Sequence, residues 1–271
     1  RRGPDASGVP FDCRKLLRPG VDFQPFPLTL TRHSAATRRF ASLRAALTGP
    51  APARATVLLG VLDHQVKALD AAGLRRELTA APGPLPARAA ALLRAERERG
   101  TEMFLRLLQD LPEVATVGSY EATVDGNFLR IAVDLTLQRS KKPLKLSAYL
   151  GLTDLFGPVP PTHFGILRRA LAEDNLIIYA GHSGIGENFR LAQIERNLRL
   201  PHDDFVRGVA GAPHQLIAFL SCYSYMYFGQ DLLAAGASRP TPGGEFVFTG
   251  DAYTKGNRGA LALLDLLDQV L

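Results

Sequence analysis

The chain of 271 residues has no tryptophan, only two cysteines and no long hydrophobic run. Two cysteines, Cys13 and Cys222, are too few for a disulfide scaffold and show no paired metal-ligand spacing. A Cys13–Cys222 disulfide stays open, but a reduced intracellular chain fits this cysteine count better. Without an apolar stretch of about 20 residues we expect no membrane span. The N-terminal RRGPDASGVPFDC lacks the apolar core of a signal peptide.

The sequence also lacks a concentrated patch of one charge. Its formal net charge of +6 comes mostly from scattered arginines, with few aromatic residues between them. Nucleic-acid binding requires a basic stripe and a recognisable module, so we expect no nucleic-acid partner. A content of 46% hydrophobic and 21% charged residues is typical of a globular protein with a real apolar core. The abundance of alanine and arginine over lysine is typical of high-GC bacterial genes, and we expect a cytoplasmic bacterial protein.

Short apolar runs alternate along the chain with segments of helical periodicity. Continuous apolar runs of this length are typical of strands buried in a parallel sheet. They are TVLLGVLD (56–63), NLIIYA (175–180), QLIAFLS (215–221) and EFVFTGDA (245–252). Helical patterns occur at 34–47, 64–78, 85–110 with an interruption at Gly100, 164–173, 187–199, 223–237 and 258–271. This alternation predicts an α/β fold, a three-layer sandwich with a mainly parallel central sheet.

The segment at about 112–150 has a different pattern. Residues 119–140 alternate apolar and polar side chains and contain Asp125-Gly126, a strong hairpin signal, and 145–152 can add a strand. We interpret this segment as a β-hairpin insertion or as the edge of the sheet. The predicted organisation is an irregular and helical N-terminal extension over 1–50, followed by one α/β domain over 51–271.

Two successive predicted strands end in residues capable of chemistry. The run LIIYAG leads to His182, and LIAFLS leads to Cys222. Ligands of open α/β sheets bind beyond the carboxyl ends of the strands, so neighbouring strands would bring imidazole and thiol together. The imidazole could activate the thiol, which also lies at the start of a predicted helix. The backbone N–H groups of Ser183 and Gly184 could hold an oxyanion.

The blocks LIIYAGHSG and LIAFLSC, in this order, resemble the two catalytic blocks of clan CD cysteine peptidases. This clan includes caspases, metacaspases, gingipains, legumains, separases and bacterial CHAT proteins. The resemblance covers about 175–252 and, more loosely, TVLLGVLD. It implies a caspase-like fold, a His182–Cys222 dyad, a polypeptide substrate and no cofactor. In the family glycine directly follows the histidine, whereas Ser183 precedes Gly184 here.

The resemblance also suggests where a substrate side chain would bind. In the family this pocket lies beside the ends of the first strand and of the strands that carry the dyad. Asp63 and Asp251 follow such strand ends, and we therefore expect a preference for arginine or lysine before the cleaved bond. The alternative is that both aspartates are helix caps or turn residues.

Other functions remain open from the sequence. The fold could be a catalytically inactive interaction module, with Cys222 a small core residue. Ser183 could be the nucleophile of a serine hydrolase, although its glycine spacing departs from a nucleophile elbow and no histidine follows His214. A metal site is the weakest alternative, because the available residues have no helical i, i+4 ligand spacing. These residues are His182, His202, Asp203, Asp204 and His214. The oligomeric state is not predicted.

Overall fold

The computed structural model describes residues 44–45, 47–61, 69–95, 101–125, 128–152, 161–181, 199, 215–221, 224, 245–248 and 256–271. The chain divides into two units, Arg1–Ala36 and Thr37–Leu271, and all described residues belong to the second. The predicted extension over 1–50 lies mostly outside the described residues and stays a prediction. The helices predicted at 187–199 and 223–237 also lie almost entirely outside them.

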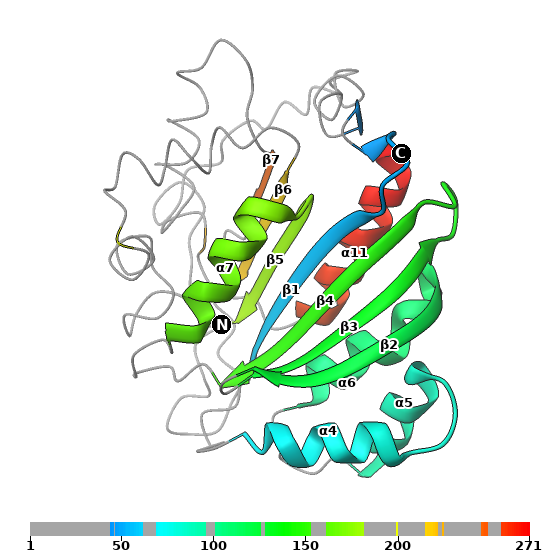
Figure 1. Ribbon diagram of the computed structural model, residues 1–271, viewed down its shortest axis with the longest axis vertical. Coiled ribbons are helices and arrows are strands. Elements are labelled where there is room, and N and C mark those ends of the chain that lie inside the picture. Colours follow the sequence, from blue (N-terminus) through cyan, green and yellow to red (C-terminus); the bar gives the residue numbers. More distant parts are fainter. Residues whose placement is uncertain are drawn as a thin grey trace, which may run out of the picture. The chain divides into compact units, whose positions relative to one another are not determined.

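Seven strands of the described part of the chain form one sheet in the order β2-β3-β4-β1-β5-β6-β7 (Figure 1). They are β1 (Ala53–Val61), β2 (Ala115–Asp125), β3 (Phe128–Leu137), β4 (Pro143–Leu152), β5 (Leu176–Gly181), β6 (Leu216–Ser221) and β7 (Glu245–Phe248). Strands β4, β1, β5, β6 and β7 are parallel to their neighbours in this group. Strand β3 runs antiparallel to both β2 and β4. The described parts of the four apolar runs and of the hairpin are thus confirmed as strands.

The sheet is mixed, so the prediction of a mainly parallel sheet with a hairpin insertion is wrong. The segment 115–152 forms three strands of the main sheet rather than a separate hairpin. The cause is the pairing of β4 with β1, which runs from Ala53↔Leu144 to Val61↔Leu152 without interruption. The interpretation of this segment as the edge of the sheet is the one that holds.

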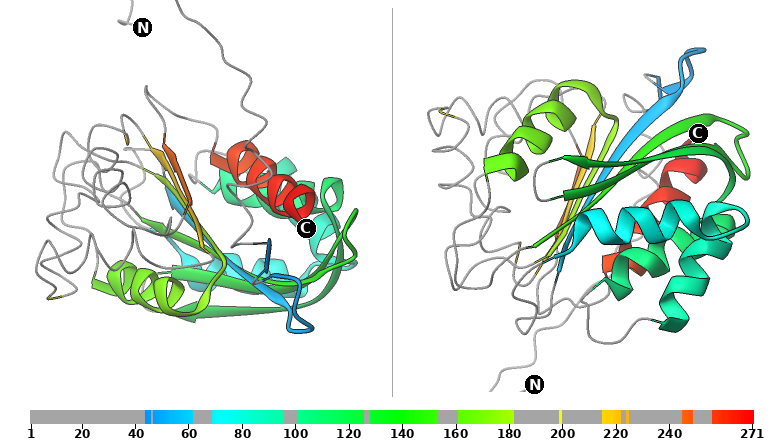
Figure 2. Two further views of the ribbon diagram at one scale, coloured as in Figure 1. Left: turned by 90° about the horizontal axis from the view of Figure 1, so that it is seen from above. Right: turned by 60° about the horizontal axis from the view of Figure 1, so that its bottom comes forward.

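Helices cover both faces of the sheet, as Figure 2 shows, which is compatible with a three-layer sandwich. They are α4 (Ala71–Ala80), α5 (Leu85–Ala95), α6 (Glu102–Asp110), α7 (Pro161–Glu173) and α11 (Gly256–Val270), with a 3-10 turn η1 (Leu111–Glu113). Helix α7 lies on one face, and α4, α5, α6 and α11 lie on the other. None of the described helices is long and apolar enough to cross a membrane.

Alternating side chains of the strands explain the two packing faces. Leu129, Leu146 and Val57 point toward the helices α4, α5, α6 and α11 and belong to one large buried cluster with them. The opposite face carries larger side chains under or beside α7, including the fully buried Tyr149 and Tyr179. Burial at about 25 cal/mol per Å² of apolar surface makes the first cluster the main source of stability.

The helix predicted over 64–78 is not continuous in its described part. Residues 69 and 70 are not helical, and α4 starts at Ala71. The carboxylate of Asp70 accepts a hydrogen bond from the backbone N–H of Gly73 at 2.7 Å, which satisfies one of the free N–H groups of the first turn. Apolar periodicity alone extended the predicted helix past this cap.

One carboxylate in α11 holds the turn between β3 and β4. Asp268 is 3% exposed and accepts hydrogen bonds of 2.8 Å from the backbone N–H groups of Arg139 and Ser140, and one of 2.6 Å from the Ser140 hydroxyl. Burial acts to raise the pKa of this carboxyl, but the hydrogen bonds from Ser140 and Arg139 outweigh it and lower the pKa. The turn and the C-terminal helix are therefore fixed to each other.

We predict that Asp268→Asn destabilises the protein by about 1–3 kcal/mol, because the amide keeps one acceptor oxygen and turns its NH2 donor toward an N–H group of Arg139 or Ser140. Since the folded-state pKa of Asp268 is lowered, its stabilisation is present above the ordinary carboxyl pKa and is lost as the pH falls through the folded-state value. Denaturant unfolding at several pH values checks both points. The control is Asp265→Asn in the same helix, whose exposed ion pair with Arg139 should matter little. Equal losses for the two variants would contradict the prediction.

Candidate functional site

The strand order creates a switch point between β1 and β5. Along the chain the parallel strand after β1 is β4, on one side of it, whereas the next strand, β5, lies on its other side. The connection through α7 therefore passes back across β1. In doubly wound sheets ligands bind beyond the carboxyl ends of the strands at such a point. The relevant strand ends here are Val61 of β1 and Gly181 of β5.

The next strand, β6, brings the second candidate block beside the first. β5 and β6 are parallel and paired along six residues, from Leu176↔Leu216 to Gly181↔Ser221. The sequence analysis made the meeting of imidazole and thiol conditional on these two strands being neighbours, and they are neighbours. The residues that follow the last pair in the sequence are His182 and Cys222.

The candidate residues themselves all belong to the segments that the structure does not describe. This holds for His182, Cys222, Ser183 and Gly184, and for the predicted pocket residues Asp63 and Asp251. The histidines and aspartates of the alternative metal site lie outside the described residues as well. Their roles stay predictions.

Small residues line the carboxyl ends of four adjacent strands. Gly151 of β4 pairs with Gly60 of β1, and Gly181 of β5 pairs with Ser221 of β6. Gly60 follows Leu59, whose partner on β5 is Ala180, so the four positions form one row across the sheet. The row lies at the switch point.

Neighbouring aromatic side chains explain why two of these positions, 181 and 151, have glycine and no larger residue. A Cβ atom on Gly181 would lie 2.7 Å from the hydroxyl oxygen of Tyr179, and one on Gly151 would lie 1.9 Å from the ring of Phe128. Both rings are almost completely buried. The hydroxyl of Tyr179 therefore lies beside Gly181, which is the last residue of β5 and directly precedes His182 in the sequence. Sequence analysis missed Tyr179, although its i, i+2 spacing from Gly181 places both on one face of the strand.

A second polar residue missed by sequence analysis lies just after Cys222. Ser224 is helical and fully buried, and its hydroxyl donates a hydrogen bond of 2.6 Å to the backbone carbonyl of Phe219 in β6. This bond joins positions three residues before and two residues after Cys222. The chain is thus anchored on both sides of the candidate nucleophile. No sequence signal indicated this contact.

A polar cluster with a structural role lies at the amino ends of the strands, opposite the carboxyl ends that lead to the candidate site. At the amino ends of β1 and β5, Arg54 pairs with Glu173 at 2.6 Å and with Asp174 at 3.4 Å. Burial raises the pKa of Asp174, against the opposing effects of Thr56 and Arg54. Gln215 donates hydrogen bonds to the carbonyls of Leu171 and Asp174. These contacts fasten the end of α7 to the sheet, far along the strands from the candidate site.

The described residues contain no group of three or more histidine, cysteine, aspartate or glutamate side chains that could hold a metal ion. Comparisons of the chain with protein-family models, with curated proteins and with solved structures found no match.

We predict that Gly181→Ala destabilises the protein by about 1–3 kcal/mol, because the added methyl group meets the Tyr179 hydroxyl. Combining it with Tyr179→Phe should recover part of the loss, giving a coupling energy of about 1 kcal/mol in a double-mutant cycle. The control is Gly165→Ala in α7, where a Cβ atom meets nothing within 4 Å and helix propensity favours alanine. Strict additivity of the two changes would refute this account of Gly181.

Proposed function

We propose that the protein is a cysteine endopeptidase in which His182 and Cys222 form the catalytic pair. The observation that carries the proposal is the pairing Gly181↔Ser221 on adjacent parallel strands beside the switch point. Each candidate is covalently joined to one member of this pair. With about 3.8 Å between consecutive Cα atoms and about 4.8 Å between strands, the Cα atoms of His182 and Cys222 are separated by at most about 12 Å.

The resemblance to clan CD peptidases supports the same assignment, because the order and spacing of the two blocks agree with it. The arrangement of the described strands adds support, since both blocks end at one edge of one sheet. A caspase-like fold and a cytoplasmic location belong to this proposal. So does a polypeptide as the substrate.

The proposed reaction proceeds in two steps. The thiolate of Cys222 attacks the peptide carbonyl carbon, and the oxyanion is held by backbone N–H groups at Ser183 and Gly184. The C–N bond breaks, the leaving amine takes a proton from the His182 imidazolium, and a thioester remains on Cys222. His182 then removes a proton from water, whose oxygen attacks the thioester carbonyl carbon; the C–S bond breaks and releases the carboxylic acid, leaving the Cys222 thiolate beside the His182 imidazolium.

The first test is covalent labelling of the full chain by peptide electrophiles, read by mass spectrometry. Cys222 should be modified much faster than Cys13, and His182→Ala should slow labelling of Cys222 by about 100-fold or more. One electrophile carries arginine next to the reactive group and a matched one carries aspartate. Faster reaction of the arginine compound is expected if Asp63 and Asp251 line the pocket. An inert Cys222 in a folded chain would favour the inactive interaction module.

The anchoring contact of Ser224 gives a separate prediction. Ser224→Ala removes the bond to the Phe219 carbonyl and should slow labelling of Cys222 by about 10-fold to 100-fold, because small displacements of reacting groups are costly. It should also shift the pH profile of labelling, which a loss of stability alone would not do. The control is Ser119→Ala, which removes an exposed hydroxyl bonded to Asp134 on β3. Unchanged rates and pH profile for Ser224→Ala would exclude a positioning role.

A further inference from the structure

Two arginines surround one buried tyrosine on the α7 face of the sheet. Tyr149 of β4 is completely buried, and its partner across the β3–β4 pair is Arg130. The guanidinium carbon of Arg130 lies 6.0 Å from the centre of the Tyr149 ring, and that of Arg169 in α7 lies 5.5 Å from it. Arg169 also donates a hydrogen bond to the Tyr149 hydroxyl. Both guanidinium groups are permanently charged.

The described part of the chain provides little compensation for these two charges. Neither Arg130 nor Arg169 forms an ion pair with a described carboxylate. Arg130 donates one long hydrogen bond of 3.4 Å to the Ser147 hydroxyl, and its buried Nε atom has no hydrogen-bond partner. Both arginines are half-buried, so an anion from solvent can reach them, and the buried Nε atom of Arg130 is a donor that the described residues leave without an acceptor.

Another arginine of this protein shows what a structural contact of the same type requires. Arg88 in α5 lies 5.6 Å from the centre of the Tyr120 ring. It donates hydrogen bonds to the Tyr120 hydroxyl and to the backbone carbonyls of Leu78, Thr79 and Gly83. Its guanidinium is therefore satisfied by acceptors of the chain. Arg130 has the same kind of ring contact without these acceptors.

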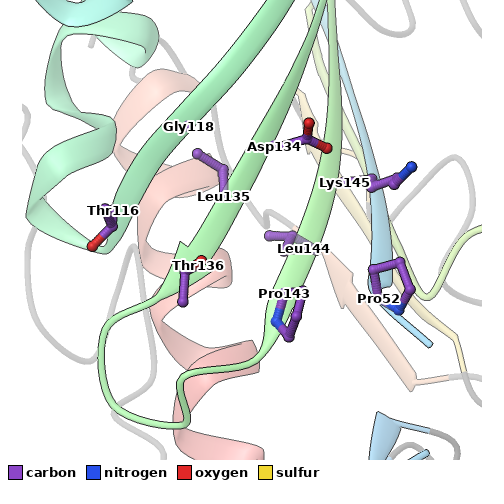
Figure 3. A pocket seen from close by; sticks show the side chains of 9 residues that line it. All are labelled: Pro52, Thr116, Gly118, Asp134, Leu135, Thr136, Pro143, Leu144 and Lys145. Carbon is purple, nitrogen blue, oxygen red and sulfur yellow. The ribbon is translucent and has the colours of Figure 1, made fainter. Parts of the chain in front are cut away.

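The face of the sheet that carries Arg130 and Tyr149 is open four residues further along the same strands, at Asp134 and Lys145. A hollow of about 300 Å³ lies over β2, β3 and β4 (Figure 3). It is lined by Pro52, Thr116, Gly118, Asp134, Leu135, Thr136, Pro143, Leu144 and Lys145. Lys145, Ser147 and Tyr149 alternate along β4 and so share one face, and Ser147 is only half-buried. The charged residues that line the hollow are Lys145 and Asp134, which are paired in register on β4 and β3 and have opposite charges. Their charges compensate each other, so the uncompensated positive charge on this face lies at the two arginines.

We propose that Arg130 and Arg169 form a binding site for an oxyanion, the carboxylate or phosphate group of a ligand that reaches them from this open face. The planar guanidinium fork matches the geometry of both groups and binds them through charge-assisted hydrogen bonds. The half-buried position strengthens such bonds relative to a fully exposed pair. The Ser147 hydroxyl, already in contact with Arg130, is available as a further donor to the anion.

Thermal unfolding of the full chain tests the proposal with two probes, inorganic phosphate and glutarate. Each is titrated at constant ionic strength maintained with sodium chloride. A saturable rise in Tm of several degrees is expected with at least one probe, because a ligand that binds only the folded state stabilises it. A rise with phosphate alone identifies a phosphate site, and a rise with glutarate identifies a carboxylate site. No saturable rise with either probe would overturn the proposal.

Variants locate the binding. Arg130→Gln should abolish the rise in Tm and Arg169→Gln should weaken it, whereas Arg168→Gln, at the neighbouring exposed position of α7, should leave it intact. Arg130→Lys keeps the charge but not the planar fork, and should weaken binding about 10-fold by calorimetry while preserving the fold. If the variants at positions 130 and 169 bind the probe as the original chain does, the anion binds elsewhere and the proposal is wrong.

Discussion

The pairing of β1 with strands on both of its sides is the constraint on which the rest of the sheet depends. Its nine residues pair with β4 along their whole length and with β5 over five positions. This single strand therefore joins β2, β3 and β4 on one side to β5, β6 and β7 on the other. Both of its faces are buried, so a shift of one residue would exchange side chains between two different cores. The fixed register of β1 determines the row of small residues and, through β5, the position of β6.

Much of the fold could be predicted from the sequence because its signals are local. The strands β5 and β6 are short apolar runs with clear ends, and Asp125-Gly126 indicates a hairpin without any tertiary information. The allocation of that hairpin to the main sheet could not be predicted, because the β1–β4 pairing depends on residues about 90 positions apart. The start of α4 was missed because a capping hydrogen bond outweighs apolar periodicity at Asp70.

The residues of the candidate site lie outside the described residues and stay predictions, whereas the strands that lead to them could be predicted. Two strand ends that carry His182 and Cys222 are a pattern of the chain itself, and the neighbouring position of the strands bears out the geometric part of that prediction. The contact of Tyr179 with Gly181 joins two positions on one face of β5, whereas the contact of Ser224 with Phe219 depends on the position of Ser224 beside β6. A hydrogen bond between a serine and a carbonyl five residues earlier leaves no periodic signal. Such contacts determine where a reactive group lies, and only the structure reveals them.

The antiparallel half of the sheet places β2 at one edge of the described strands. An edge of eleven residues would ordinarily invite another chain to pair with it and polymerise. The register of β2 with β3 shifts between Val117 and Tyr120, which interrupts the regular spacing of backbone groups along this edge. The longest regular stretch left for an incoming strand is Tyr120–Asp125, and it carries the exposed Glu121. The irregularity near Gly118 thus disfavours edge-to-edge pairing of β2 with another chain and leaves the pairing of the inner strands unchanged.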